Sequence, residues 1–158
     1  MEYAEGGSLA QLMKAREVRK NPFSEEEVLT YLSQLVLSLQ MLHSKQIVHR
    51  DIKSLNIFIK DGILKLGDFG ISKLLEHTHT QGTLIGTPYF MAPEVILGKK
   101  YGTKADVWAL GVVLYELIAL KKPFNGSGVK QLFECITEHP LQPLPEGVSP
   151  SLKMLVSQ

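Results

Sequence analysis

Residues 49–56 read His49-Arg50-Asp51-Ile52-Lys53-Ser54-Leu55-Asn56. This stretch combines an imidazole, a guanidinium, a carboxylate, an ammonium and a carboxamide, which makes it too polar for a protein core. These residue types can hold ions and transfer protons. We therefore expect a functional site at residues 49–56, with the segments on either side supporting it.

The residues that follow are typical of a β-hairpin. Residues 57–59 are apolar and β-prone, Asp61-Gly62 is a two-residue turn signal, and residues 63–66 return with alternation. With Asp61-Gly62 as the turn, Asn56 is expected to face Gly67.

Asp68 comes directly after Gly67, so a carboxamide and a carboxylate should meet at the open end of the hairpin. Oxygen ligands of this kind suit Mg²⁺, which takes few protein ligands and keeps the rest for water and phosphate. Asp51 would lie on the same rim, where its carboxylate could orient a substrate hydroxyl.

Three motifs follow one another in the sequence, namely His49-Arg50-Asp51 with Asn56, then Asp68-Phe69-Gly70, then Ala92-Pro93-Glu94. In this order and at this spacing they resemble the motifs of a eukaryotic protein kinase. The resemblance implies an α+β, mostly α-helical fold, namely the C-terminal lobe of the protein-kinase-like fold with a small β-hairpin carrying the metal site. It also implies an ATP-dependent enzyme that transfers the γ-phosphate to Ser/Thr hydroxyls of protein substrates.

The same resemblance assigns roles to the polar residues. It makes Asp51, Lys53 and Asn56 catalytic and makes Asn56 and Asp68 the Mg²⁺ ligands, while His49 is expected to be structural. Lys53 two residues after Asp51 is the serine/threonine arrangement, and its ammonium would neutralise the transferring phosphoryl group.

The N-terminal residues resemble the hinge of a kinase, although Met1 could also be a true start followed by a flexible terminus. In the hinge interpretation, backbone groups of Glu2 and Ala4 bind adenine and Ser8 faces the ribose. Phe58 would lie beneath adenine, where a Leu is commoner, and its larger ring could narrow the nucleotide pocket.

Residues 68–94 resemble an activation segment. Thr83 is the expected activating phosphosite, with Thr78 and Thr80 as weaker candidates. A phosphate there could pair with Arg50 and Lys73. Thr87 is expected to position the substrate. The His77-Thr78-His79-Thr80 alternation has no Cys or carboxylate at ligand spacing, so a solvated loop is favoured over a metal site.

Helical patterns surround the motifs. Ser8 is a predicted N-cap, and Ser24 and Glu27 form a predicted capping box. Further helices are expected at about 103–120, which is apolar nearly all round, at 129–138, and from residue 151. The resemblance to kinases implies that the Asp106 carboxylate accepts backbone hydrogen bonds from the catalytic loop, here residues 49–56. The predicted buried face of the helix after Ser24 is Val28, Tyr31, Leu32, Leu35, Val36, Leu39 and Leu42.

Composition narrows the class of protein. The 158 residues are 44% hydrophobic and 21% charged, as in one globular domain, and the net charge of +1 gives no reason to expect nucleic acid or an anionic membrane. The longest apolar run, residues 107–120, is too short for a membrane span of about 20 residues.

The single Cys135 excludes an internal disulfide and is expected to be a small buried residue. With no signal peptide visible, a cytoplasmic or nuclear location is expected.

The resemblance covers residues 1–158 but only the larger lobe, so we expect a partial kinase domain truncated at both ends. The stretches at 52–59, 67–71 and 86–89 are most similar to those of the NIMA-related (never-in-mitosis) kinases. Ser54, where many kinases have Pro, is the best single discriminator. The expected partners are ATP, protein substrates and an upstream activating kinase. The alternative is a non-catalytic binding module or dominant-negative fragment, and we expect the 158-residue chain alone to be inactive because half of the phosphate cradle is missing.

Overall fold

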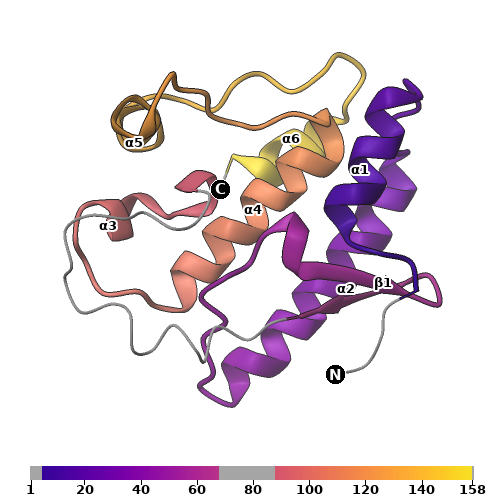
Figure 1. The fold of residues 1–158 in the computed structure, drawn as a ribbon, viewed down its shortest axis with the longest axis horizontal. Helices are drawn as coiled ribbons and strands as arrows, with labels where there is room; N and C mark the ends of the chain where they lie inside the picture. Colours follow the sequence, from indigo (N-terminus) through magenta and orange to yellow (C-terminus); the bar gives the residue numbers. More distant parts are fainter. Residues whose placement is uncertain (1–4, 68–87, 158) are drawn as a thin grey trace.

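The computed structural model describes residues 5–67 and 88–157. This part is mostly helical, with one antiparallel hairpin, as the sequence predicts (Figure 1). Its elements in chain order are α1 (Leu9–Val18), α2 (Glu25–Ser44), the 3₁₀ turn η1 (Ser54–Asn56), β1 (Ile57–Lys60), β2 (Ile63–Leu66), the 3₁₀ turn η3 (Pro88–Phe90), α3 (Pro93–Ile96), α4 (Thr103–Ala119), α5 (Val129–Glu138) and α6 (Pro150–Val156).

Helix α4 runs through the middle of the molecule, with α2 and the hairpin to one side and α3 and α5 to the other (Figure 1). Its apolar residues lie on nearly every face, so it can be buried by several neighbours at once. Val113 and Leu117 are buried in the main core, whereas Val107 is 51% exposed. The predicted internal helix is therefore confirmed, although the apolar Val107 near its start is exposed.

Helix α2 starts at the predicted capping box. The Ser24 Oγ accepts a hydrogen bond from the Glu27 N–H, and the Glu27 carboxylate accepts one from the Ser24 N–H. Of the predicted buried face, Val28, Leu35 and Leu39 are buried. The prediction for Val36 is wrong, since this side chain is 44% exposed. Val36 follows Leu35 by about 100° around the helix and so leaves the face that packs on α4.

The hairpin has the predicted register. Ile57 pairs with Leu66 and Lys60 with Ile63, so Asp61 and Gly62 form the turn, both with positive φ. Two positive φ angles are what a type I′ turn needs to match the twist of the strands. Leu64 of β2 is buried, and its N–H donates a 2.8 Å hydrogen bond to the Gln34 side chain of α2.

The C-terminal part forms a smaller apolar cluster. Trp108 of α4 stacks on Phe124 with ring centroids 6.0 Å apart, and Leu132 and Ile136 of α5 pack against them. Cys135 is only half-buried, and its Sγ lies 3.2 Å from the Asn125 carbonyl oxygen, so the prediction that it is a buried residue is wrong.

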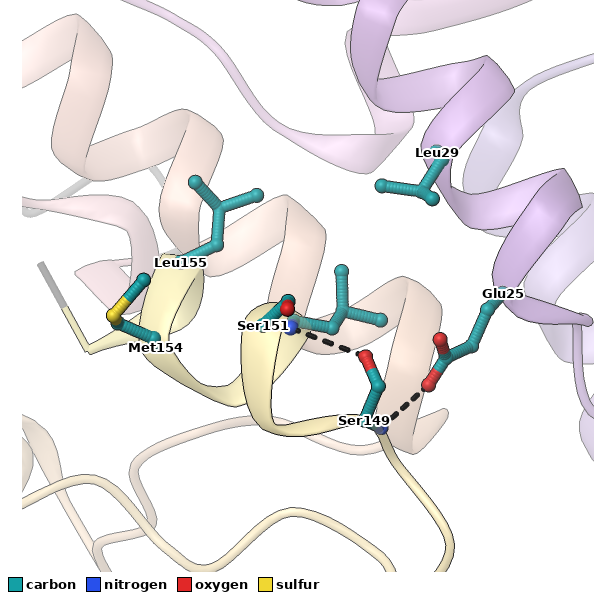
Figure 2. A pocket seen from close by; sticks show the side chains of 7 residues that line it. Glu25, Leu29, Ser149, Ser151, Met154 and Leu155 are labelled. Atoms are coloured by element: carbon teal, nitrogen blue, oxygen red, sulfur yellow. Dashed lines mark hydrogen bonds between the residues drawn. The ribbon is translucent and has the colours of Figure 1, made fainter.

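A hydrogen bond connects the start of α6 to the start of α2. The Ser149 Oγ accepts the Leu152 N–H, and the Ser149 N–H donates to a Glu25 carboxylate oxygen at 2.5 Å (Figure 2). Leu29, Met154 and the other residues drawn in Figure 2 line a small pocket between the two helices. This contact joins residues far apart in the sequence across one edge of the core.

Among the helices that the structure describes, none combines the length and the apolar character needed to cross a bilayer.

Candidate active site

The segment between α2 and β1 brings the three expected catalytic side chains together. The Lys53 Nζ lies 3.1 and 3.0 Å from the two carboxylate oxygens of Asp51. The Asn56 Nδ2 donates to Asp51 twice, at 2.7 Å to Oδ2 and at 3.0 Å to the backbone carbonyl. The turn η1 makes this possible because it folds Asn56 back toward Asp51 before β1 begins.

The Asn56 side chain is suited to a cation. Both of its amide protons point at Asp51, so its Oδ1 is left as the oxygen that could bind a metal. The Gly67 N–H donates to the Asn56 carbonyl at 2.9 Å, which places the end of β2 beside Asn56 as predicted. Asp68, the other expected ligand, lies outside the described residues. Within the described ranges, no group of three or more His, Cys, Asp or Glu residues could hold a metal by itself.

The backbone of the catalytic loop is held by Asp106 at the start of α4. This carboxylate is fully buried and accepts the His49 N–H at 2.9 Å and the Arg50 N–H at 3.0 Å. Arg50 has a φ of 68°, an uncommon conformation for a non-glycine residue that needs support from its surroundings. The expected contact of Asp106 with the catalytic loop is confirmed.

Two further groups contact Asp106 that the sequence analysis did not identify. The His43 Nε2 lies 2.8 Å from Oδ2, and the Tyr101 hydroxyl donates to Oδ1 at 3.0 Å. Burial, and then the negative charge of Asp106, raise the pKa of Tyr101 far above its usual range, so the hydroxyl stays a donor. The sequence shows only that His43 lies in the last turn of α2 and that Tyr101 comes just before α4, which does not indicate that the two side chains meet.

His49 is 1% exposed, which agrees with the expected structural role. Burial lowers its pKa below the usual range despite the opposing charges of Asp106 and Asp51, so the imidazole is neutral at pH 7. Its Nδ1 lies 3.4 Å from the Asp51 N–H, a weak contact in which the ring nitrogen is the acceptor. The expected packing against Phe69 lies outside the described residues.

On the expected nucleotide side, residues 6–8 lie along β1. The Gly6 N–H donates to the Ile59 carbonyl at 3.0 Å, the Ile59 N–H donates to the Gly7 carbonyl at 2.9 Å, and Ser8 forms a bridge with Phe58. The Ser8 hydroxyl is buried and accepts the Gln11 N–H as the cap of α1. Its expected role toward the ribose stays a prediction.

Phe58 is half-buried, and its ring lies against the backbone of Gly67. A methyl group on Gly67 would lie 2.4 Å from the Phe58 Cε2, closer than carbon atoms can approach. Gly67 is therefore required by the larger ring at position 58. The expected place of Phe58 beneath adenine stays a prediction.

Several expected site residues are not described by the structure. They are Glu2, Ala4, Asp68, Lys73, Thr83 and Thr87. Arg50, the other expected phosphate partner, is described, and its guanidinium forms no ion pair with any residue in the described ranges.

Comparisons with known proteins identify the family of this chain. The family described as "Protein kinase domain" matches residues 1–158. The serine/threonine-protein kinase Nek5 of Homo sapiens is 43% identical over 161 residues, which cover 100% of this chain and 22% of that protein. The serine/threonine-protein kinase nekl-2 of Caenorhabditis elegans is 41% identical over 163 residues, covering 99% and 46%. The probable serine/threonine-protein kinase nek3 of Dictyostelium discoideum is 42% identical over 163 residues, covering 99% and 14%.

The chain thus spans 14% to 46% of the length of these three curated relatives. The match runs along the whole chain and includes the segment that carries Asp51, Lys53 and Asn56. This chain belongs to the protein kinase domain family, and its relatives are NIMA-related serine/threonine kinases.

Proposed function

We propose that the protein transfers the γ-phosphate of ATP to serine and threonine hydroxyls of protein substrates. The observation that carries this proposal is the cluster of Asp51, Lys53 and Asn56. The Lys53 ammonium and the Asn56 amide both lie within 3.1 Å of the Asp51 carboxylate oxygens. The loop that carries them is hydrogen-bonded to the buried Asp106 carboxylate. A family relationship to serine/threonine kinases supports the same reaction.

In this proposal Asp51 orients the substrate hydroxyl and accepts its proton as the hydroxyl oxygen bonds to the γ-phosphorus. The bond from that phosphorus to the bridging β-phosphate oxygen breaks, and ADP leaves. Lys53 contributes positive charge beside the transferring group, and its contacts with both Asp51 oxygens keep that charge at the reacting centre. Positioning and charge stabilisation supply most of the catalysis in phosphoryl transfer, so a rigid cluster of this kind is what the reaction needs.

Mg²⁺ would be held by the Oδ1 of Asn56 together with Asp68, and it would neutralise charge on the nucleotide phosphates. The protein's part is to fix Asn56, which it does through the two hydrogen bonds to Asp51. An upstream activating kinase and a cytoplasmic or nuclear location belong to the same proposal.

The test is phosphate transfer by the intact protein to matched peptides that differ only in carrying Ser, Thr or Tyr as acceptor. We expect transfer to Ser and Thr that requires Mg²⁺, and loss of at least about 100-fold in kcat for Asp51→Asn with nucleotide binding retained, as for removal of a general base. Turnover by Asp51→Asn at the wild-type rate would contradict the assignment. Transfer to none of the peptides by the activated wild-type protein would contradict the proposed function.

A further inference from the structure

A cavity of about 610 Å³ lies beside the catalytic loop. Ser54 and Leu55, which follow Lys53 in the sequence, form part of its wall. Met13 of α1 and Phe90 of η3 line other parts, so the cavity lies between segments that are far apart in the sequence. A peptide whose hydroxyl reached Asp51 would therefore have a neighbouring side chain close to this cavity.

The cavity wall also contains a buried charge. Glu116 of α4 is only 5% exposed, and its Oε1 forms an ion pair with the Lys122 ammonium. Its Oε2 has no hydrogen-bond partner among the residues that the structure describes. Burial raises the pKa of this carboxyl, while the charge of Lys122 opposes the rise. A buried carboxylate oxygen without a donor costs stability, so it is a feature that needs a reason.

Lys122 covers this carboxylate from the solvent side. Its side chain is 34% exposed, and its Nζ also lies 4.5 Å from the centre of the Phe90 ring and 5.5 Å from that of Tyr89. Two rings and one carboxylate therefore hold the ammonium at the cavity. An incoming Arg or Lys side chain would find the Glu116 charge already neutralised and would meet a like charge.

We propose that Lys122 takes, from within the chain, the position on Glu116 that a basic side chain of a substrate peptide would otherwise occupy. Lys122 is thus a specificity-determining residue, and with Lys122 in place the cavity selects an uncharged side chain next to the acceptor. This inference rests on the proposed function, since it concerns the choice among acceptor peptides. It attributes the choice between charged and uncharged peptide side chains to the Lys122–Glu116 ion pair, which one substitution can remove.

The experiment uses the intact protein and a set of peptides with one Ser acceptor. A single Arg is moved through the flanking positions, and a peptide with Gln at the same position is the reference. We expect Lys122→Met to raise kcat/KM for the Arg peptide over its Gln reference by about tenfold at one position relative to wild type, as a new charged hydrogen bond to Glu116 would. Fluorescence anisotropy of the same peptides should show the same gain in affinity.

Lys121→Met is the matched control. Lys121 lines the same cavity and is exposed, but it forms no ion pair with a described residue, so its loss removes the same charge without uncovering Glu116. We expect the peptide preference of Lys121→Met to equal that of wild type. In the double variant Lys122→Met with Glu116→Gln, the gain for Arg should disappear.

Lys122→Gln is the second variant in case Lys122→Met folds poorly, because it keeps one N–H donor for Glu116 but removes the charge. A smaller gain for Arg at the same position is expected. No gain in either variant, with both folded by circular dichroism, would overturn the proposal, as would a gain that persists with Glu116→Gln. If wild type transfers no phosphate to any peptide, the proposed function fails, while the anisotropy measurements still decide the role of Lys122.

Discussion

The Asp106 carboxylate accepts the backbone N–H of Arg50 at 3.0 Å, while Arg50 itself has a φ of 68°. The buried acceptor and the left-handed backbone occur together because each supports the other. A buried carboxylate is costly unless N–H or O–H groups donate to it, and the backbone N–H groups of the loop do so. In return, the fixed carboxylate stabilises the uncommon backbone conformation of Arg50. The shape of the catalytic loop is thus stabilised from α4.

Replacing Asp106 by Asn is expected to destabilise the protein. The amide keeps the shape of the side chain but presents an NH₂ group to donors that need an acceptor, and leaving one buried donor unpaired costs about 1–3 kcal/mol. Urea denaturation should show this loss, together with a large fall in phosphate transfer. Tyr101→Phe removes only one of the four groups around Asp106 and should cost about 1 kcal/mol. An Asp106→Asn variant with wild-type stability would contradict this account.

His49 is expected to make stability depend on pH. Its folded-state pKa is lowered by burial, so below the ordinary His pKa of about 6.5 the unfolded chain binds a proton that the folded protein does not. Stability from this group is therefore present above about pH 6.5 and is lost as pH falls toward the folded pKa. The free energy of unfolding, measured by urea between pH 7.5 and about 5.5, should fall more steeply in wild type than in His49→Asn. His139→Gln, at an exposed position, should retain the wild-type slope.

Gly67→Ala is expected to destabilise the hairpin by about 1–3 kcal/mol, because the added methyl group overlaps the Phe58 ring. Adding Phe58→Leu should restore most of the loss by removing the ring edge. Gly111→Ala is the matched control, since a methyl group there meets no atom within 4 Å, and it should be neutral or slightly stabilising in a helix. Thermal unfolding of wild type, Gly67→Ala, Phe58→Leu and the double variant measures the coupling between positions 58 and 67. Additive effects of the two substitutions would refute the contact.

Thr83 is predicted to be the activating phosphosite, on the sequence alone. A phosphate adds about −1.5 to −2 charges at neutral pH, which Arg50 and Lys73 could pair with. In the intact protein Thr83→Ala should abolish the activation that treatment with an upstream kinase produces, whereas Thr80→Ala should retain it. Full activation of Thr83→Ala would show that the activating phosphate lies elsewhere.

The sequence predicted the local features well. The capping interactions of Ser8 and Ser24, the turn at Asp61-Gly62 and the register of β1 with β2 all follow from residues close in the chain. Such features depend on backbone geometry over three to five residues, so the residue types suffice. Asp51, Lys53 and Asn56 were selected through the resemblance to protein kinases, and the structure brings their side chains together because all three belong to one short loop.

The sequence by itself therefore determined the motifs, the family and the elements that carry them. Only the tertiary structure decided how His43 and Tyr101 join Asp106, that Val36 faces solvent, and that Lys122 covers a buried Glu116 in a cavity. These contacts connect elements through side chains whose meeting depends on how α4 packs against its neighbours. Periodicity along one element carries no information about the polar groups that a different element brings to it.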